Sequence, residues 1–134
     1  MRALVPVARL LFVALFLMSA PNHFKAQTIA YAAQQGVPAA GLLVPLSGVI
    51  ATLGGLSVTL GYKAKIGAWL LVLFLVPVTL LMHNFWAVTD PMMRGMQTAL
   101  FMKNVSMLGA ALLITHFGAG PLSLDAPRAF SPTA

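Results

Sequence analysis

The feature that most constrains this chain is a series of four apolar runs, each close to the roughly 20 residues that a transmembrane helix needs. Inside a bilayer only helices and closed barrels satisfy all of their backbone hydrogen bonds, and runs of this length suit helices. We therefore predict an all-α fold, a bundle of four transmembrane helices. The predicted spans are 4–20, 41–62, 66–86 and 98–117.

The composition fits lipid rather than water as the main solvent. Hydrophobic residues make up 60% of the chain and charged residues 7%, too few charges to cover a soluble domain. The second run is the clearest, because no charged residue occurs between Lys25 and Lys63. The first run also has signal-peptide features, with Arg2 and Arg9 near its start. Pro21 disfavours cleavage, so we expect a retained helix.

Several classes of chemistry are excluded by the residues that the chain lacks. There is no Cys, so disulfides and thiolate-held clusters are excluded. The only two side-chain carboxylates, Asp90 and Asp125, should lie on opposite faces of the bilayer, which excludes paired-carboxylate catalysis. The net charge is +6, but the basic residues are scattered singly, so we expect no nucleic-acid binding.

The distribution of basic residues predicts the orientation. Five lie on the side of the termini and three on the other side, so the positive-inside rule places both termini in the cytoplasm. We expect one membrane domain over residues 1–120 and an irregular cytoplasmic tail over 121–134. The residues counted on the side of the termini are Arg2, Arg9, Lys63, Lys65 and Arg128, and those on the other side are Lys25, Arg94 and Lys103.

Two connecting stretches are expected to be ordered. Residues 24–35 are typical of a short interfacial helix that ends at Gly36, with Pro38 beyond it. Asp90 and Pro91 form an N-cap and first-position pair, so the fourth helix should begin there, outside the membrane.

Small residues recur every four positions in the second span, at Ser47, Ala51 and Gly55. Between helices in lipid, small residues allow close backbone approach, so this face is a candidate packing seam. Glycine is also simply common in transmembrane helices, and both interpretations stay open.

Polar side chains gather at the outer ends of the predicted spans. His23 and His83 should lie at similar depth, but only Asp90 could complete a ligand set, so we expect neither a metal site nor a haem. Lys103 either lines a polar cavity or extends to the interface as an anchor. The sequence assigns no catalytic residue. The candidate cluster comprises His23, His83, Trp86, Asp90, Arg94, Lys103 and Asn104.

Part of this cluster would suit a small aromatic or quinone-like head group. Such a ligand needs an apolar slot with one or two hydrogen-bond donors at its mouth. His83, Trp86, Lys103 and Asn104 could supply those donors, and they could equally form a belt of interfacial anchors.

Short motifs in a fixed order run along nearly the whole chain: Arg9-Leu-Leu-Phe, Gly36-Val-Pro38, Leu53-Gly-Gly55, His83-Asn-Phe-Trp86, Phe101-Met-Lys-Asn104 and Pro121-Leu-Ser-Leu-Asp125. Their order and spacing resemble the DoxX family of small four-helix membrane proteins. One position departs from that pattern. Many relatives carry a Glu just before the Leu-x-Gly-Gly stretch, where this chain has Ala51, so no role of that carboxylate carries over.

The resemblance implies a multi-pass protein of the bacterial inner membrane that serves as an accessory subunit in quinone-linked or redox-defence metabolism. It implies a non-catalytic subunit, with redox-complex proteins as partners besides lipid, a quinone as a candidate ligand and a possible homo-oligomer. Two alternatives stay open. One is a small-solute or proton-conducting membrane protein, suggested by Pro77 in the third span, and the other is a purely structural scaffold.

Overall fold

The computed structural model describes residues 1–127, and all regular structure in that range is helical. Four of its helical segments are long and apolar enough to cross a membrane. The predicted all-α class and the four-helix membrane bundle are confirmed. The helices are α1 (Leu4–Ser19), α2 (Ala26–Gln34), α3 (Ala40–Leu60), α4 (Ala64–Met82) and α5 (Pro91–Phe117), with the 3₁₀ turns η1 (Ala20–Phe24) and η2 (Phe85–Ala87).

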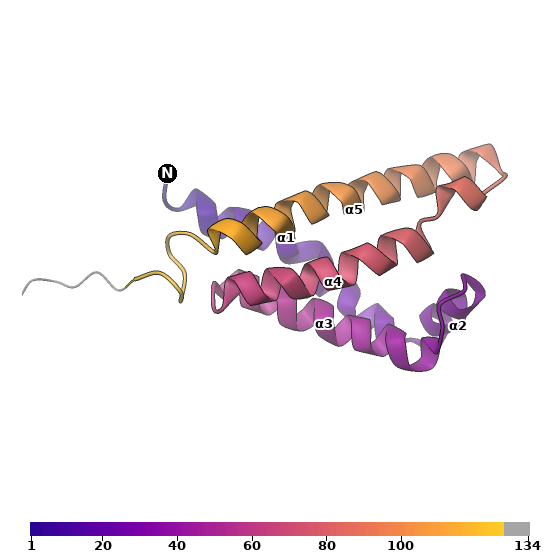
Figure 1. The fold of residues 1–134 in the computed structure, drawn as a ribbon, viewed down its shortest axis with the longest axis horizontal. Coiled ribbons are helices and arrows are strands. Elements are labelled where there is room, and N and C mark those ends of the chain that lie inside the picture. Colours follow the sequence, from indigo (N-terminus) through magenta and orange to yellow (C-terminus); the bar gives the residue numbers. More distant parts are fainter. Residues whose placement is uncertain (128–134) are drawn as a thin grey trace, which may run out of the picture.

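The long helices pack in the order α1, α3, α4, α5. Helices α3 and α4 run side by side as an antiparallel pair, α5 lies along α4, and α1 packs on α3 (Figure 1). The start of α1 and the end of α5 lie at the same end of the bundle, which we call the terminal end. Helix α2 and the start of α5 lie at the opposite, distal end.

Local signals account for two of the helix boundaries. The Asp90 carboxylate accepts a hydrogen bond from the Met93 backbone at 2.8 Å and so caps α5 where the sequence predicts its start. Helix α2 ends at Gln34 and is closed by Gly36, which has a φ of 88°, and the next amide, Val37, donates back to the Ala32 carbonyl at 3.1 Å. This is the left-handed helix end that glycine favours. The short helix predicted between the first two spans is therefore present.

Small residues place α3 at the centre of the bundle. A Cβ on Gly54 would lie 2.9 Å from the carbonyl oxygen of Gly67 on α4. A Cβ on Gly55 would lie 2.8 Å from Leu17 on α1, and Ala51 is fully buried. These contacts let α3 approach both neighbours closely, as small residues do in membrane bundles.

The core lies at mid-length, where α1 and α4 meet over α3. Phe16 of α1 packs edge to face on Phe74 of α4, with ring centroids 5.9 Å apart, and Val13, Leu71 and Ala111 fill the same cluster. Many large apolar side chains lie outside this core and are exposed. In a membrane they contact lipid. The division into a domain over 1–120 and a tail over 121–134 stays a prediction, and Arg128 lies outside the described residues.

Candidate functional site in the helix bundle

A cavity of about 690 Å³ lies inside the bundle, and every α-helix contributes to its lining. Its volume falls in the range of about 300–1,000 Å³ that is usual for small-molecule sites. Most of its wall is apolar, formed by leucine, valine, isoleucine, phenylalanine, methionine and proline side chains. The polar side chains of the wall are Ser19, His23, Thr28, Ser47, His83, Lys103 and Asn104.

His23 reaches this cavity because the η1 turn carries it across α3. Its ring lies over Phe74, with centroids 5.5 Å apart, and its Nδ1 lies 2.9 Å from the Ser47 hydroxyl. That hydroxyl donates its own hydrogen to the carbonyl of Val44 at 2.6 Å, so Nδ1 is the donor of the pair. A Cβ on Gly48 would lie 2.7 Å from the His23 Cβ. Glycine at position 48 therefore makes room for the histidine.

His83 lines the cavity from the end of α4. Its Nδ1 lies 2.9 Å from Oε1 of Gln97 on α5, an amide oxygen that can only accept, so this histidine also donates from Nδ1. The contact ties the distal ends of α4 and α5 together. Trp86 is exposed on η2 and packs edge to face on Phe101, with centroids 5.9 Å apart, outside the cavity.

Lys103 and Asn104 line the cavity from α5. Asn104 is only 5% exposed and Lys103 is partly buried. The side-chain hydrogen bonds along the helix, as far as the chain is described, involve Gln97, Thr98, Ser106 and Thr115 instead. At 1.5 Å per residue, Lys103 is about 18 Å from the start of α5, near its middle. Two adjacent polar groups therefore face the cavity without a partner from the described residues.

The seven predicted site residues thus divide into two groups. His23, His83, Lys103 and Asn104 come together around one cavity. The other three lie outside it: Trp86 on η2, Asp90 as the cap of α5, and Arg94 on the exposed first turn of α5. Between residues 1 and 127, no three His, Cys, Asp or Glu side chains lie close enough to hold a metal ion.

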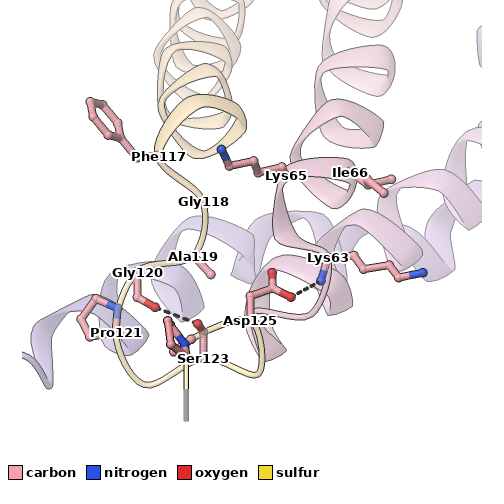
Figure 2. A pocket seen from close by; sticks show the side chains of 12 residues that line it. Lys63, Lys65, Ile66, Phe117, Gly118, Ala119, Gly120, Pro121, Ser123 and Asp125 are labelled. Atoms are coloured by element: carbon pink, nitrogen blue, oxygen red, sulfur yellow. Dashed lines mark hydrogen bonds between the residues drawn. The ribbon is translucent and has the colours of Figure 1, made fainter. Parts of the chain in front are cut away.

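A second pocket, of about 640 Å³, lies at the terminal end, where the segment after α5 folds back against the start of α4 (Figure 2). The Asp125 carboxylate accepts hydrogen bonds from the backbone amides of Lys63 and Ala64 at 2.8 and 2.9 Å. These two N–H groups lower the pKa of the Asp125 carboxyl below its usual value, and the Ala64 group has the larger effect. Asp125 therefore caps α4 from a distant part of the sequence.

Arg9 fixes the same segment from the side of α1. It is 5% exposed, and it donates from Nη1 to the Ala119 carbonyl at 3.2 Å and from Nη2 to the Leu122 carbonyl at 2.6 Å. Gly61, with a φ of 64°, lies beside it, and a Cβ there would overlap Ser123 and crowd the guanidinium. These polar contacts join the two ends of the described chain.

The sequence interpretation missed several of these roles. It treated Arg9 as an orientation charge and Ser47 as a packing residue, and it gave Asp125 no partner. Phe74, which supports His23, was not singled out. Only Ser47 had a detectable signal, as the one hydroxyl on the small-residue face of the second span.

The model of the SURF4 family matches residues 42–129, well over half of the chain. The chain belongs to the SURF4 family. The matched region covers α4 and α5 and nearly all of α3. It therefore includes three of the four polar cavity residues that the sequence singled out, all except His23.

A curated relative of this SURF4-family chain is the ER-derived vesicles protein ERV29 of Saccharomyces cerevisiae. The two are 35% identical over 65 residues, which is 48% of this chain and 21% of the yeast protein. The chain thus matches about a fifth of the length of that relative. No solved structure matches the chain.

The SURF4 match corrects the expectations that rested on the DoxX resemblance. That family assignment was wrong. The prediction of an accessory redox subunit, with a quinone ligand and redox partners, was wrong with it, and the alternative of a structural membrane protein is closer to these findings. The bacterial inner membrane was also wrong, because the similar yeast protein is named for ER-derived vesicles. The findings therefore describe a multi-pass membrane protein of the SURF4 family.

Proposed function

We propose that this SURF4-family chain is a non-catalytic binding protein of the membrane, whose cavity holds the apolar part of a ligand. The cavity itself supports this function most directly. Its volume of about 690 Å³, its apolar wall and the small number of polar groups around it are the usual properties of a ligand site.

The hydrogen bonds that the carboxylates and the cavity side chains already make favour binding over catalysis. Both side-chain carboxylates serve as helix caps, Asp90 on α5 and Asp125 on α4. In the cavity, His23 donates to a hydroxyl that is itself committed to a backbone carbonyl, an arrangement that does not activate that serine as a nucleophile. The polar groups are thus suited to orienting a ligand.

The yeast relative is named for ER-derived vesicles, and we propose that the present chain serves in a membrane of that kind. This part of the proposal rests on the family and not on the cavity. A second copy of the chain, or a protein partner, stays a prediction. Candidate contact surfaces are the exposed methionines at the start of α5, Met92, Met93 and Met96.

Occupation of the cavity can be tested with one pair of variants on α4. Val78 lines the cavity, whereas Leu80 is exposed on another face of the same helix. The chain would be extracted with its surrounding lipid in polymer nanodiscs, and tightly held small molecules would be quantified by mass spectrometry. We expect a molecule near one per chain in the wild type and in Leu80→Trp, and its loss in Val78→Trp, because the indole fills the site.

Equal retention in all three proteins would show that the bound molecule lies outside the cavity, and the proposed function would then be rejected. The helical circular dichroism of each variant controls for folding.

A further inference from the structure

The cavity contains a cation that nothing in the described chain neutralises. Lys103 lines it, and the chain has only two side-chain carboxylates, Asp90 and Asp125. The Asp90 carboxylate binds the Met93 amide at 2.8 Å, and the Asp125 carboxylate caps α4 at the terminal end. An ammonium near hydrocarbon is unfavourable unless it is paired or hydrated. A negatively charged partner for this ammonium would have to come from outside these residues, because both carboxylates are already bound elsewhere.

The neighbouring side chain points to the same need. Asn104 is 95% buried, being 5% exposed, it lines the cavity, and its amide has no hydrogen-bond partner among residues 1–127. The amide atoms of Asn104 are not enclosed by protein, so they are open to the cavity and available to a ligand there. Lys103 and Asn104 together offer an ammonium and an amide N–H group, which is the donor set for a carboxylate or phosphate oxygen.

The rest of the wall indicates the nature of the remaining ligand. Phe16, Ile50 and Val78 present only apolar surface. A peptide segment would bring backbone N–H and C=O groups, which need hydrogen-bond partners that these apolar positions do not provide. A hydrocarbon chain has no such requirement.

The cavity is also accessible from the bilayer. Leu15 on α1 and Leu73 on α4 line it, and their side chains are 42% and 58% exposed. Wall residues as exposed as these mark a side of the cavity that protein does not close. A ligand can therefore enter sideways from the membrane without crossing either end of the bundle.

Building on the binding function proposed above, we infer that the ligand is an anionic amphiphile of the lipid type. Its carboxylate or phosphate group binds the Lys103 ammonium and the Asn104 amide, and its hydrocarbon chain lies along the apolar wall. Hydrogen bonds between charged groups are the stronger kind, so the acid group supplies the selectivity and the chain supplies contact area.

Three probes with the same hydrocarbon chain test this inference: oleate, oleyl phosphate and the neutral oleyl alcohol. Their dissociation constants would be measured by native mass spectrometry on the full chain in nanodiscs of neutral lipid. We expect both acids to bind at least about tenfold more tightly than the alcohol, as one charged hydrogen bond implies. The tighter of the two acids identifies the acid group.

Variants of Lys103 assign the effect to the cavity. Lys103→Met should weaken binding of the acids by roughly tenfold to a hundredfold and leave oleyl alcohol unchanged, whereas Lys103→Arg should retain the preference. Arg94→Met is the matched control, because Arg94 is a cation on α5 that does not line the cavity. If Lys103→Met does not fold, Asn104→Leu tests the same contact, with a smaller loss expected.

The possible outcomes separate this inference from the proposed function. Equal binding of acid and alcohol, unaffected by Lys103→Met but abolished by Val78→Trp, would overturn the anionic class and leave the binding cavity in place. Failure of all three probes to bind would overturn the lipid class, and the retention test with Val78→Trp then decides the proposed function separately. Displacement of oleate only by an acidic apolar peptide, with the peptide bound more tightly, would assign the site to a protein segment instead.

Discussion

The terminal end buries the basic side chain of Arg9 and the cavity partly buries that of Lys103, but the two side chains differ in what surrounds them. At the terminal end, Arg9 donates from Nη1 and Nη2 to the carbonyls of Ala119 and Leu122, and only its Nε has no partner among residues 1–127. In the cavity, Lys103 and Asn104 have no such partners among the described residues. Burial alone therefore does not distinguish a structural cation from one that binds a ligand. The presence or absence of partners within the chain does.

The comparison implies opposite effects of mutation at the two places. Removing a polar group that has its partners leaves those partners unsatisfied and lowers stability. Removing a polar group that has no partner within the chain relieves the cost of burying that group, so it lowers the affinity for the ligand and does not lower folding stability.

The largest loss is expected from Arg9→Met. The substitution keeps an apolar stem of similar length but removes two hydrogen bonds from a charged donor, and we expect the free energy of unfolding to fall by about 3 kcal/mol. Unfolding in mixed detergent micelles, followed by circular dichroism, measures this. Arg2→Met is the control, because Arg2 is exposed and such sites change stability by about 0.5 kcal/mol or less. Equal losses in both variants would contradict the structural role of Arg9.

A slightly smaller loss is expected from Gly61→Ala. Gly61 has a φ of 64°, and an added Cβ would overlap Ser123 and crowd Arg9, so strain and overpacking together should cost about 2–3 kcal/mol. Gly109→Ala is the matched control, because Gly109 lies within α5 with open space around its Cα. There alanine should raise stability by up to about 1 kcal/mol. A destabilised Gly109→Ala would show that the loss at Gly61 is not specific to the turn.

Asp125 gives a pH-dependent test of the same end. Its pKa is lowered in the folded chain by the Ala64 and Lys63 amides. The carboxylate therefore contributes its full share to folding stability above the unfolded pKa of about 3.9. The contribution is lost as the pH falls through the lower, folded pKa. We expect Asp125→Asn to reduce Tm at neutral pH by less than Arg9→Met does. The difference from the wild type should shrink as the pH falls through the lowered pKa of the native carboxyl, where that carboxyl protonates. A difference that persists there would place the effect elsewhere.

The smallest effect, of opposite sign, is expected from Lys103→Met. In ligand-free micelles its free energy of unfolding should be unchanged or higher by up to about 1 kcal/mol, as is common when a functional polar group is removed. The unfolding assay used for Arg9→Met gives the direct comparison. A loss as large as that of Arg9→Met would show that Lys103 has a structural partner, and the contrast between the two regions would fail.

Much of the fold could be predicted from the sequence because it depends on local signals. The apolar runs identify the long helices, and Asp90 with Pro91 marks the start of α5 even though the fourth apolar run was placed from residue 98 onward. Gly36 marks the end of α2. Each of these signals acts within a few residues of its effect, through a cap or a left-handed backbone.

The candidate site was predicted only in part, because it depends on contacts between distant segments. His23 enters the cavity only because the η1 turn carries it across α3 and Gly48 leaves room for it. The partners of Arg9 are backbone carbonyls 110 and 113 residues away. Every residue has a carbonyl, so the sequence contains no pattern that marks these two.

The mistaken family assignment has a related cause. The Leu53-Gly-Gly55 motif contains the glycines at which α3 meets α1 and α4. Any tightly packed membrane bundle selects small residues at such crossings. A motif of this kind indicates how helices pack, and it does not identify which family, membrane or activity a chain has.

The contact between Arg9 and the segment after α5 also sets an order of events during synthesis. The chain emerges from its N-terminus, so Arg9 is made long before the carbonyls of Ala119 and Leu122, which follow 110 and 113 residues later. Until then its guanidinium must remain hydrated or bound to lipid phosphate at the membrane surface. The two hydrogen bonds that fix Arg9 can therefore form only after translation has passed residue 122, so α1 is joined to the segment after α5 late in synthesis.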